Sequence, residues 1–166
     1  MSDHAFRFGY QLRSRNADEL LAEAVAAEAA GFDVIHTFDH VDAHWPPLAP
    51  LAAIAGSTTR IRLCPLVINN DFRHPVHLAR EVAALDHLTG GRMELGLGAG
   101  HAFTEYEALG LPFDAPATRK ARLSEGVEVL RRLLDGETVS FEGEHYQLRD
   151  VRTMRSLQLH LPILVG

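Results

Sequence analysis

Short apolar segments recur in the first part of the chain at nearly constant spacing, and this spacing restricts the possible folds more than any other feature. The segments begin near residues 6, 33, 61 and 92, so their offsets are 27, 28 and 31 residues. That is about the length of one strand, one loop and one helix. A helical pattern follows each of the first three segments. The sequence therefore predicts parallel strands joined by helices.

The expected strands are Phe6–Leu12, Phe32–Phe38, Ile61–Ile68 and Arg92–Leu97. The helices between them are expected at Ala17–Ala30, at Leu48–Thr59 and from Pro75 to just before Gly90. Asn16 with Glu19 resembles a capping box, and Pro75 lies at a first helical position, where its missing N–H is not needed. Pro65 lies inside the third strand and offers no N–H to the ladder. It predicts a bulge or a break there.

The pattern changes after Gly100. A loop is expected as far as Pro116, followed by a long helix, a β-hairpin and a last core strand. These elements are expected at Ala117–Asp135, at Thr138–Phe141 with His145–Leu148, and at Leu159–Val165. About five parallel strands with an inserted hairpin fit either an open doubly wound sheet or a (β/α) barrel.

Composition narrows the class of protein. The chain is 46% hydrophobic and 23% charged, which is typical of one globular domain, expected over residues 1–166. A formal charge of −6 without a basic patch argues against a nucleic-acid partner. No targeting or membrane segment is recognisable, so a cytoplasmic protein without a membrane association is expected. The single cysteine, Cys64, is interpreted as a small buried thiol.

In both candidate folds, ligands bind at the carboxyl ends of the parallel strands. The residues just past the expected strand ends are therefore candidates: Gln11, Arg13, Asp39, His40, Asn69, Asn70, Gly98 to His101 and Gly166. Asp39 and His40 form the best catalytic candidate, because a histidine exchanges protons near neutral pH and a carboxylate orients groups or holds charge. The alternative is a loop start in which Asp39 caps backbone N–H groups.

The glycines from Gly96 to Gly100 suggest two interpretations. A dinucleotide-binding fingerprint would need a further glycine where His101 stands, so that match fails. The glycines either form a tight turn or let the backbone lie close against a planar ligand, and the second interpretation is favoured.

Three histidines are spaced as metal ligands on a helix would be. His36 lies in a strand, however, and Pro46–Pro47 limits any helix that could carry His40 and His44. No metal site is predicted.

Several separated segments resemble the luciferase-like flavin-dependent oxidoreductases, most closely the branch that uses the deazaflavin coenzyme F420. They are Gly31–His40 (GFDVIHTFDH), Leu66–Pro75 (LVINNDFRHP), Ala79–Gly100 (AREVAALDHLTGGRMELGLGAG) and Pro162–Gly166 (PILVG). The helix and hairpin between residues 119 and 146 also resemble that family, so the resemblance covers essentially the whole chain.

This resemblance implies a (β/α) barrel with the flavin or deazaflavin ring across the strand ends. His40 would be the proton-transfer residue, with Asp39 beside it. The bulged segment at Leu66–Val67, often containing a non-proline cis peptide bond, would back the ring. The cofactor contacts implied are Asp39, Leu66, Val67, Ile68, Asn69, Gly98, Ala99, Gly100, His101 and Gly166.

A closed barrel of this kind has eight strands, whereas about five are expected here, so a partial barrel is predicted. The expected function is hydride transfer between F420, or alternatively FMN, and a small organic substrate. Because unpaired strand edges invite association, a homodimer or a complementary subunit would complete the site. The alternatives are a truncated, cofactor-free relative that serves as a non-catalytic subunit or binding module, or a cofactor-independent acid/base (cyclase-type) enzyme.

Overall fold

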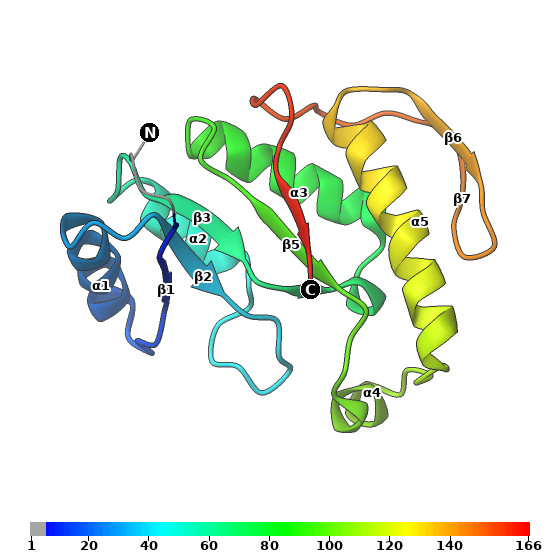
Figure 1. Cartoon of the computed structure of the whole chain (residues 1–166), viewed down its shortest axis with the longest axis horizontal. Coiled ribbons are helices and arrows are strands. Elements are labelled where there is room, and N and C mark those ends of the chain that lie inside the picture. The colour runs from blue at the N-terminus through cyan, green and yellow to red at the C-terminus, as the bar shows by residue number, and fades with distance from the viewer. Residues whose placement is uncertain (1–5) are drawn as a thin grey trace.

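The computed structural model describes residues 6–166, in which a curved parallel sheet is covered on one side by helices (Figure 1). The parallel strands are β1 (Gly9–Gln11), β2 (Val34–Thr37), β3 (Arg62–Pro65), β4 (Ile68–Asn69), β5 (Leu95–Gly98) and β8 (Ile163–Val165). The helices are α1 (Ala17–Ala29), α2 (Ala49–Ala55), α3 (Pro75–Leu88), α4 (Phe103–Leu109) and α5 (Pro116–Leu134), with a short 3₁₀ turn, η1, at Asn70–Phe72.

The order of the strands decides between the two folds left open by the sequence. β1, β2 and β3 pair in that order, β4, β5 and β8 pair in that order, and a parallel bridge between Leu63 and Met93 joins the two groups. Helix α1 packs on α2, α2 on α3, and α3 on α5, so the helices form one continuous layer. A doubly wound sheet would have helices on both faces. The fold is therefore a partial (β/α) barrel.

The expected break near Pro65 is present. β3 ends at Pro65, β4 begins at Ile68, and the Leu66–Val67 peptide bond between them is cis. The segment thus departs from the sheet and rejoins it at the carboxyl ends of the strands.

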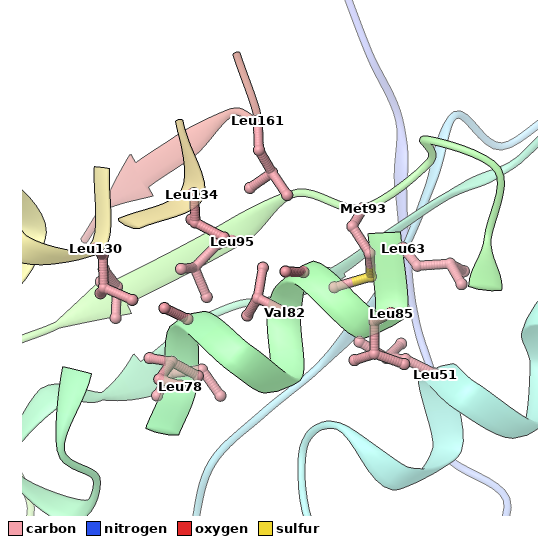
Figure 2. Close-up of a cluster of buried hydrophobic side chains, with 14 of the residues drawn as sticks. Leu51, Leu63, Leu78, Val82, Leu85, Met93, Leu95, Leu130, Leu134 and Leu161 are labelled. Atoms are coloured by element: carbon pink, nitrogen blue, oxygen red, sulfur yellow. The ribbon is translucent and has the colours of Figure 1, made fainter. Parts of the chain in front are cut away.

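The core lies between the sheet and the helical layer. Leu63 and Leu95 from the strands belong to one buried cluster with Val82 of α3 and Leu130 of α5, and all four side chains are fully buried (Figure 2). Because side chains alternate along a strand, the neighbouring residues of β3 and β5 point to the opposite, concave face. Cys64 lies there, and burial raises the pKa of its thiol to about 12, which confirms the expected buried thiol.

The region after Gly100 differs from the expectation in two respects. The last strand, expected from Leu159, begins only at Ile163. The predicted loop contains α4, a short helix that ends at Gly110 in the left-handed conformation. The predicted hairpin is confirmed as β6 (Val139–Glu142) paired antiparallel with β7 (Gln147–Val151). No helix within residues 6–166 combines the length and apolar character needed to cross a membrane.

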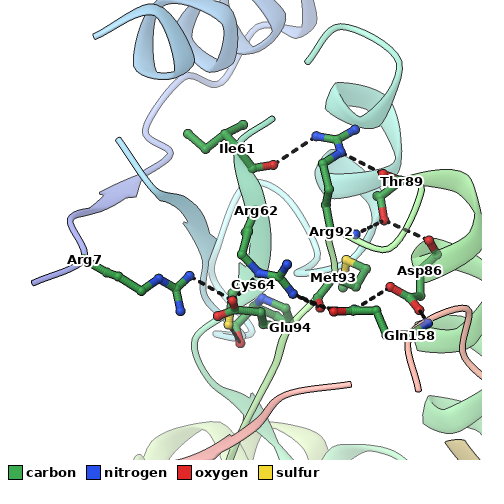
Figure 3. A network of polar contacts seen from close by, with 11 residues as sticks. Arg7, Ile61, Arg62, Cys64, Asp86, Thr89, Arg92, Met93, Glu94 and Gln158 are labelled. Atoms are coloured by element: carbon green, nitrogen blue, oxygen red, sulfur yellow. Dashed lines mark hydrogen bonds and ion pairs between the residues drawn. The ribbon is translucent and has the colours of Figure 1, made fainter. Parts of the chain in front are cut away.

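A cluster of charged groups closes the amino-terminal end of the sheet, and we call it the Glu94 cluster (Figure 3). The buried Glu94 carboxylate pairs with Arg62 at the start of β3 and accepts a bond of 2.8 Å from Arg7. Arg62 also donates to Gln158 Oε1 at 2.9 Å, and Gln158 Nε2 donates to Asp86 of α3 at 2.7 Å. These contacts tie β3, β5 and α3 to the segment before β8.

Candidate active site

A hollow of about 320 Å³ lies at the carboxyl ends of the strands, a size at the lower end of small-molecule sites. Its lining residues come from the ends of β2, β4, β5 and β8, from the segment between β3 and β4, and from α4: Phe38, Asp39, His40, Leu66, Val67, Asn69, Gly98, Ala99, Gly100, His101, Glu105 and Gly166. The structure therefore brings together, in one place, most of the residues that the sequence suggested.

Ile68 is one of the expected cofactor contacts that does not line the hollow. Its side chain is fully buried in the core and does not line the hollow. The reason is the alternation of side chains along an extended segment, which directs Ile68 toward the helices and its neighbour Asn69 toward the strand ends. Gln11 and Arg13 line a different cavity, and Asn70 donates to the Tyr146 hydroxyl at 3.0 Å.

His40 is held by a residue that the sequence did not suggest. Its Nδ1 lies 2.7 Å from Oε1 of Glu105 in α4, which also accepts a bond of 3.3 Å from the backbone N–H of Val41. A carboxylate at Nδ1 favours the tautomer in which Nδ1 carries the proton. Among residues 6–166, Nε2 of His40 has no hydrogen-bond partner. The arrangement leaves Nε2 able to accept or release a proton at the hollow.

Asp39 is engaged on both of its carboxylate oxygens. Arg73 binds both oxygens, with Nη2 at 3.1 Å from Oδ1, and the backbone N–H of Asn69 donates to Oδ2 at 3.0 Å. The Asp39 side chain is only 7% exposed. Asp39 thus joins the end of β2 to the end of β4 and fixes the loop that carries His40.

One wall of the hollow is apolar. Leu66, next to the cis peptide bond, and Phe38, just past β2, are 39% and 38% exposed. Exposed large apolar side chains beside polar groups are typical of ligand sites. The wall offers a surface against which a flat, apolar ring system can lie.

Packing within the protein constrains the glycine turn after β5. A Cβ at Gly98 would lie 2.7 Å from the Val67 side chain, and one at Gly100 would collide with the hydroxyl of Tyr106. Gly100 also has a φ of +75°, which glycine adopts at little cost. Protein packing therefore requires both glycines at these positions. The close approach of a ligand is not needed to explain them.

Arg119 of α5 holds the same turn from behind. Its guanidinium donates to the carbonyl oxygens of Ala99 and Gly100 and lies 4.0 Å from the ring centroid of Phe113. Tyr106 donates to Asn69 Oδ1 at 3.1 Å. These side chains make the turn rigid and join it to β4.

Four important residues were missed by the sequence interpretation: Arg73, Glu105, Tyr106 and Arg119. Leu109 followed by Gly110 is a helix-stop pattern that could have indicated α4. Nothing local indicates that Glu105 meets His40, since 65 positions separate them. Within residues 6–166, no group of three or more His, Cys, Asp or Glu side chains is arranged to hold a metal ion.

Comparison with known proteins agrees with this geometry. The family model described as luciferase-like monooxygenase matches residues 4–166. An F420-dependent glucose-6-phosphate dehydrogenase from Nakamurella multipartita is 36% identical over 176 residues, covering 100% of this chain and 52% of the relative. One from Microbacterium testaceum is 34% identical over 170 residues, covering 96% and 50%.

Solved structures of a monooxygenase and of an F420-dependent reductase also resemble this chain. A monooxygenase from Streptomyces bottropensis superposes with a TM-score of 0.81 at 32% identity, covering 96% of this chain and 53% of that one. The coenzyme F420-dependent tetrahydromethanopterin reductase from Methanopyrus kandleri gives 0.86 at 28% identity, covering 96% and 50%. The chain spans about half the length of the curated relatives it matches. It belongs, as its fold and its motifs indicate together, to the luciferase-like monooxygenase family of oxidoreductases.

Proposed function

We propose that this chain binds coenzyme F420 in the hollow at the strand ends and takes part in hydride transfer to or from a small organic substrate. The observation that carries the proposal is the convergence on one hollow of an apolar wall, a rigid glycine turn and a histidine with an available Nε2. Several relatives with at least 30% identity are F420-dependent by name, which favours F420 over FMN.

The residues around the hollow fit such a cofactor. Leu66 and Phe38 supply exposed apolar surface for a planar ring, and the cis peptide segment between β3 and β4 brings Val67 to the same wall. Asn69 and His101 add polar groups at the rim. When bound, the deazaflavin or flavin ring supplies the hydride chemistry, and the protein supplies orientation and proton transfer.

His40 is the proposed proton-transfer residue. Glu105 keeps the proton on Nδ1 and stabilises the imidazolium that forms when Nε2 takes up a second proton. The proton that accompanies hydride transfer would thus pass to or from Nε2. Asp39 has both oxygens bound to Arg73, so we assign it a positioning role, which is to hold the His40 loop against β4.

A cofactor titration tests the binding. Purified protein is mixed with F420 or with FMN, passed through ultrafiltration and examined by visible absorption. Saturable retention of F420 is expected, because the apolar wall and glycine turn are already in place. Retention of FMN instead would change the cofactor assignment. If neither is retained, the non-catalytic subunit or a cofactor-independent enzyme becomes the better interpretation.

A His40→Ala variant tests the mechanism. With a panel of small alcohols and ketones, the absorbance change of F420 should slow by roughly 10²- to 10⁴-fold, because general acid–base catalysis contributes about that much. Cofactor retention should change far less. The matched control is His160→Ala, which removes a largely exposed imidazole. Unchanged turnover in His40→Ala would remove His40 from the mechanism.

We also propose that the unpaired edges of the sheet are covered by a second copy of the chain or by a complementary subunit. Within the described residues, β1 pairs only with β2 and β8 only with β5. Leu164 and Val165 of β8 are 38% and 63% exposed, which favours association at this edge. Light scattering should give a mass above that of one chain. A monodisperse monomer at working concentration would contradict this.

A further inference from the structure

A second cavity, of about 390 Å³, lies beside the hollow. It is formed by the loop after β1 and the loop after β2, so it also opens at the carboxyl ends of the strands. Phe38 lines both the cavity and the hollow, which makes it the shared wall between them. A molecule in the cavity would therefore be a neighbour of one in the hollow.

The floor of the cavity is apolar and its sides are tied together. Leu12, Leu20 and Pro50 are buried residues that line it. The indole Nε1 of Trp45 donates to the carbonyl oxygen of Ser14 at 2.9 Å, which joins the two loops. The cavity is thus a built space with an apolar bottom.

The rim carries two arginines, and the Glu23 carboxylate beside it accepts bonds from the backbone N–H groups of Arg13 and Ser14. Arg13 and Arg15 line the cavity, and neither guanidinium makes a hydrogen bond or an ion pair with any residue in the described range 6–166. By contrast, Arg62 and Arg73, near the sheet, are each paired with a carboxylate. Asp42 is the one acidic side chain among the lining residues. Two available guanidinium groups above an apolar floor would suit a ligand with an anionic end.

We infer that this cavity binds a small organic anion, with its apolar body against Trp45 and its carboxylate or phosphate on Arg13 and Arg15. Guanidinium groups suit both anions because their planar donors match the oxygens of either. The identification of this anion as the substrate rests on the proposed function. Its reacting end would reach the hollow past Phe38, where His40 is available.

Trp45 provides a direct readout, because it is the only tryptophan in the sequence. The cofactor-free chain is titrated with benzoate, with phenyl phosphate and with benzyl alcohol while its tryptophan fluorescence is followed. A saturable change is expected with one or both anions and a much weaker response with the uncharged alcohol. The preferred anion identifies the head group. Equal responses to all three probes would overturn the proposal.

Substitutions test the role of the arginines. The double variant Arg13→Gln, Arg15→Gln should raise the Kd of the preferred anion by about tenfold or more, as expected for lost charge-assisted hydrogen bonds. Asp42→Asn should lower that Kd, because it removes the opposing charge. The matched control is Arg149→Gln, an exposed arginine on β7. An unchanged Kd in the double variant would overturn the proposal.

Repeating the titration with saturating F420 separates this inference from the proposed function. Simultaneous binding of anion and cofactor supports a substrate site beside the cofactor. Competition would overturn the substrate assignment, since the cavity would then hold an anionic part of the cofactor itself. If the anion binds but F420 is not retained, the anion site stands and the proposed function fails.

Discussion

The two ends of the same sheet are built in opposite ways. At the amino-terminal end, the buried Glu94 carboxylate is paired with two partly exposed arginines, Arg62 and Arg7 (Figure 3). At the carboxyl-terminal end, Phe38 and Leu66 expose apolar surface and His40 has an available ring nitrogen. In barrels of this kind, the first end serves stability and the second serves binding. The difference indicates which substitutions should affect folding and which should affect function.

The amino-terminal end is also closed by Arg92. Its guanidinium donates to the carbonyl oxygens of Ala55, Thr58, Ile61 and Thr89, at distances of 2.7 to 3.1 Å. One side chain thus provides hydrogen-bond donors for backbone carbonyl oxygens at the end of α2, just before β3 and at the end of α3. Such a residue contributes to the packing of the loops and leaves no group available for a ligand.

Glu94→Gln should produce the largest loss of stability. The substitution removes the charge that compensates Arg62 and Arg7 while keeping the size of the side chain. Breaking a buried ion pair typically costs about 3–5 kcal/mol. Because Arg62 and Arg7 are partly exposed, at 29% and 48%, we expect the free energy of unfolding to fall by about 3 kcal/mol. Urea unfolding measures this change in the free energy of unfolding.

Glu137→Gln is the matched control for that variant. It removes a carboxylate that pairs with Arg132 at 2.9 Å, but this carboxylate is exposed, whereas that of Glu94 is buried. Exposed ion pairs contribute roughly 0–1 kcal/mol, so little change is expected. In the folded Glu94→Gln protein, F420 retention should match the wild type, since the cluster lies at the other end of the sheet. Equal losses of stability in both variants would contradict the contrast between the ends.

Gly98→Ala should affect both stability and binding. A Cβ there would lie 2.7 Å from the Val67 side chain, so the cis peptide segment or β5 would have to move. Overpacking of this kind costs about 1–3 kcal/mol, and movement of Val67 should also weaken cofactor retention. Gly56→Ala is the control, because no atom lies near its Cβ position and its φ of −81° suits alanine. Normal F420 retention in Gly98→Ala would contradict the proposed role of this wall.

Much of the fold was predictable because local chemistry determines it. The βα spacing, the break at Pro65 and the start of α3 at Pro75 follow from the chain's apolar periodicity and its prolines. Helix α4 was not predictable to the same degree, because it has seven residues and its N-cap, Ala102, offers no side-chain bond. The choice between a barrel and an open sheet required the strand order, which no local pattern reveals.

The candidate site was predictable only in part, for a similar reason. Asp39, His40 and the glycine turn follow directly after strands, where ligands bind in such folds. Their partners come from distant segments: Glu105 lies 65 positions from His40, and Arg73 lies 34 positions from Asp39. Contacts over such separations depend on the packing of α4 and of the loop after β4. The sequence therefore indicates the proposed proton-transfer residue but not the carboxylate that holds it in place.

Glu28→Gln should have the smallest effect of these variants, and one that depends on pH. The Glu28 carboxylate, at the end of α1, accepts bonds from the backbone N–H groups of Thr59, Arg60 and Ile61 at 2.7 to 3.1 Å. Burial alone would raise the pKa of Glu28, but these hydrogen bonds outweigh it and hold the pKa below its ordinary value of 4.5. They also join α1 to the amino-terminal end of the sheet.

The sign of the pH dependence follows from that lowered pKa. The contribution of Glu28 is fully present above pH 4.5 and is lost as the pH falls through the folded-state pKa. We expect Glu28→Gln to cost about 1 kcal/mol at pH 7, since hydrogen bonds to a charged acceptor are replaced by weaker ones. Urea unfolding at a series of pH values should give curves that converge in acid, whereas Glu81→Gln, on the exposed side of α3, should follow the wild type throughout. A loss of unfolding free energy that persists in acid would mean that the uncharged Glu28 side chain stabilises the fold as well as the charged one. Charge would then contribute less to the amino-terminal end than the Glu94 cluster suggests.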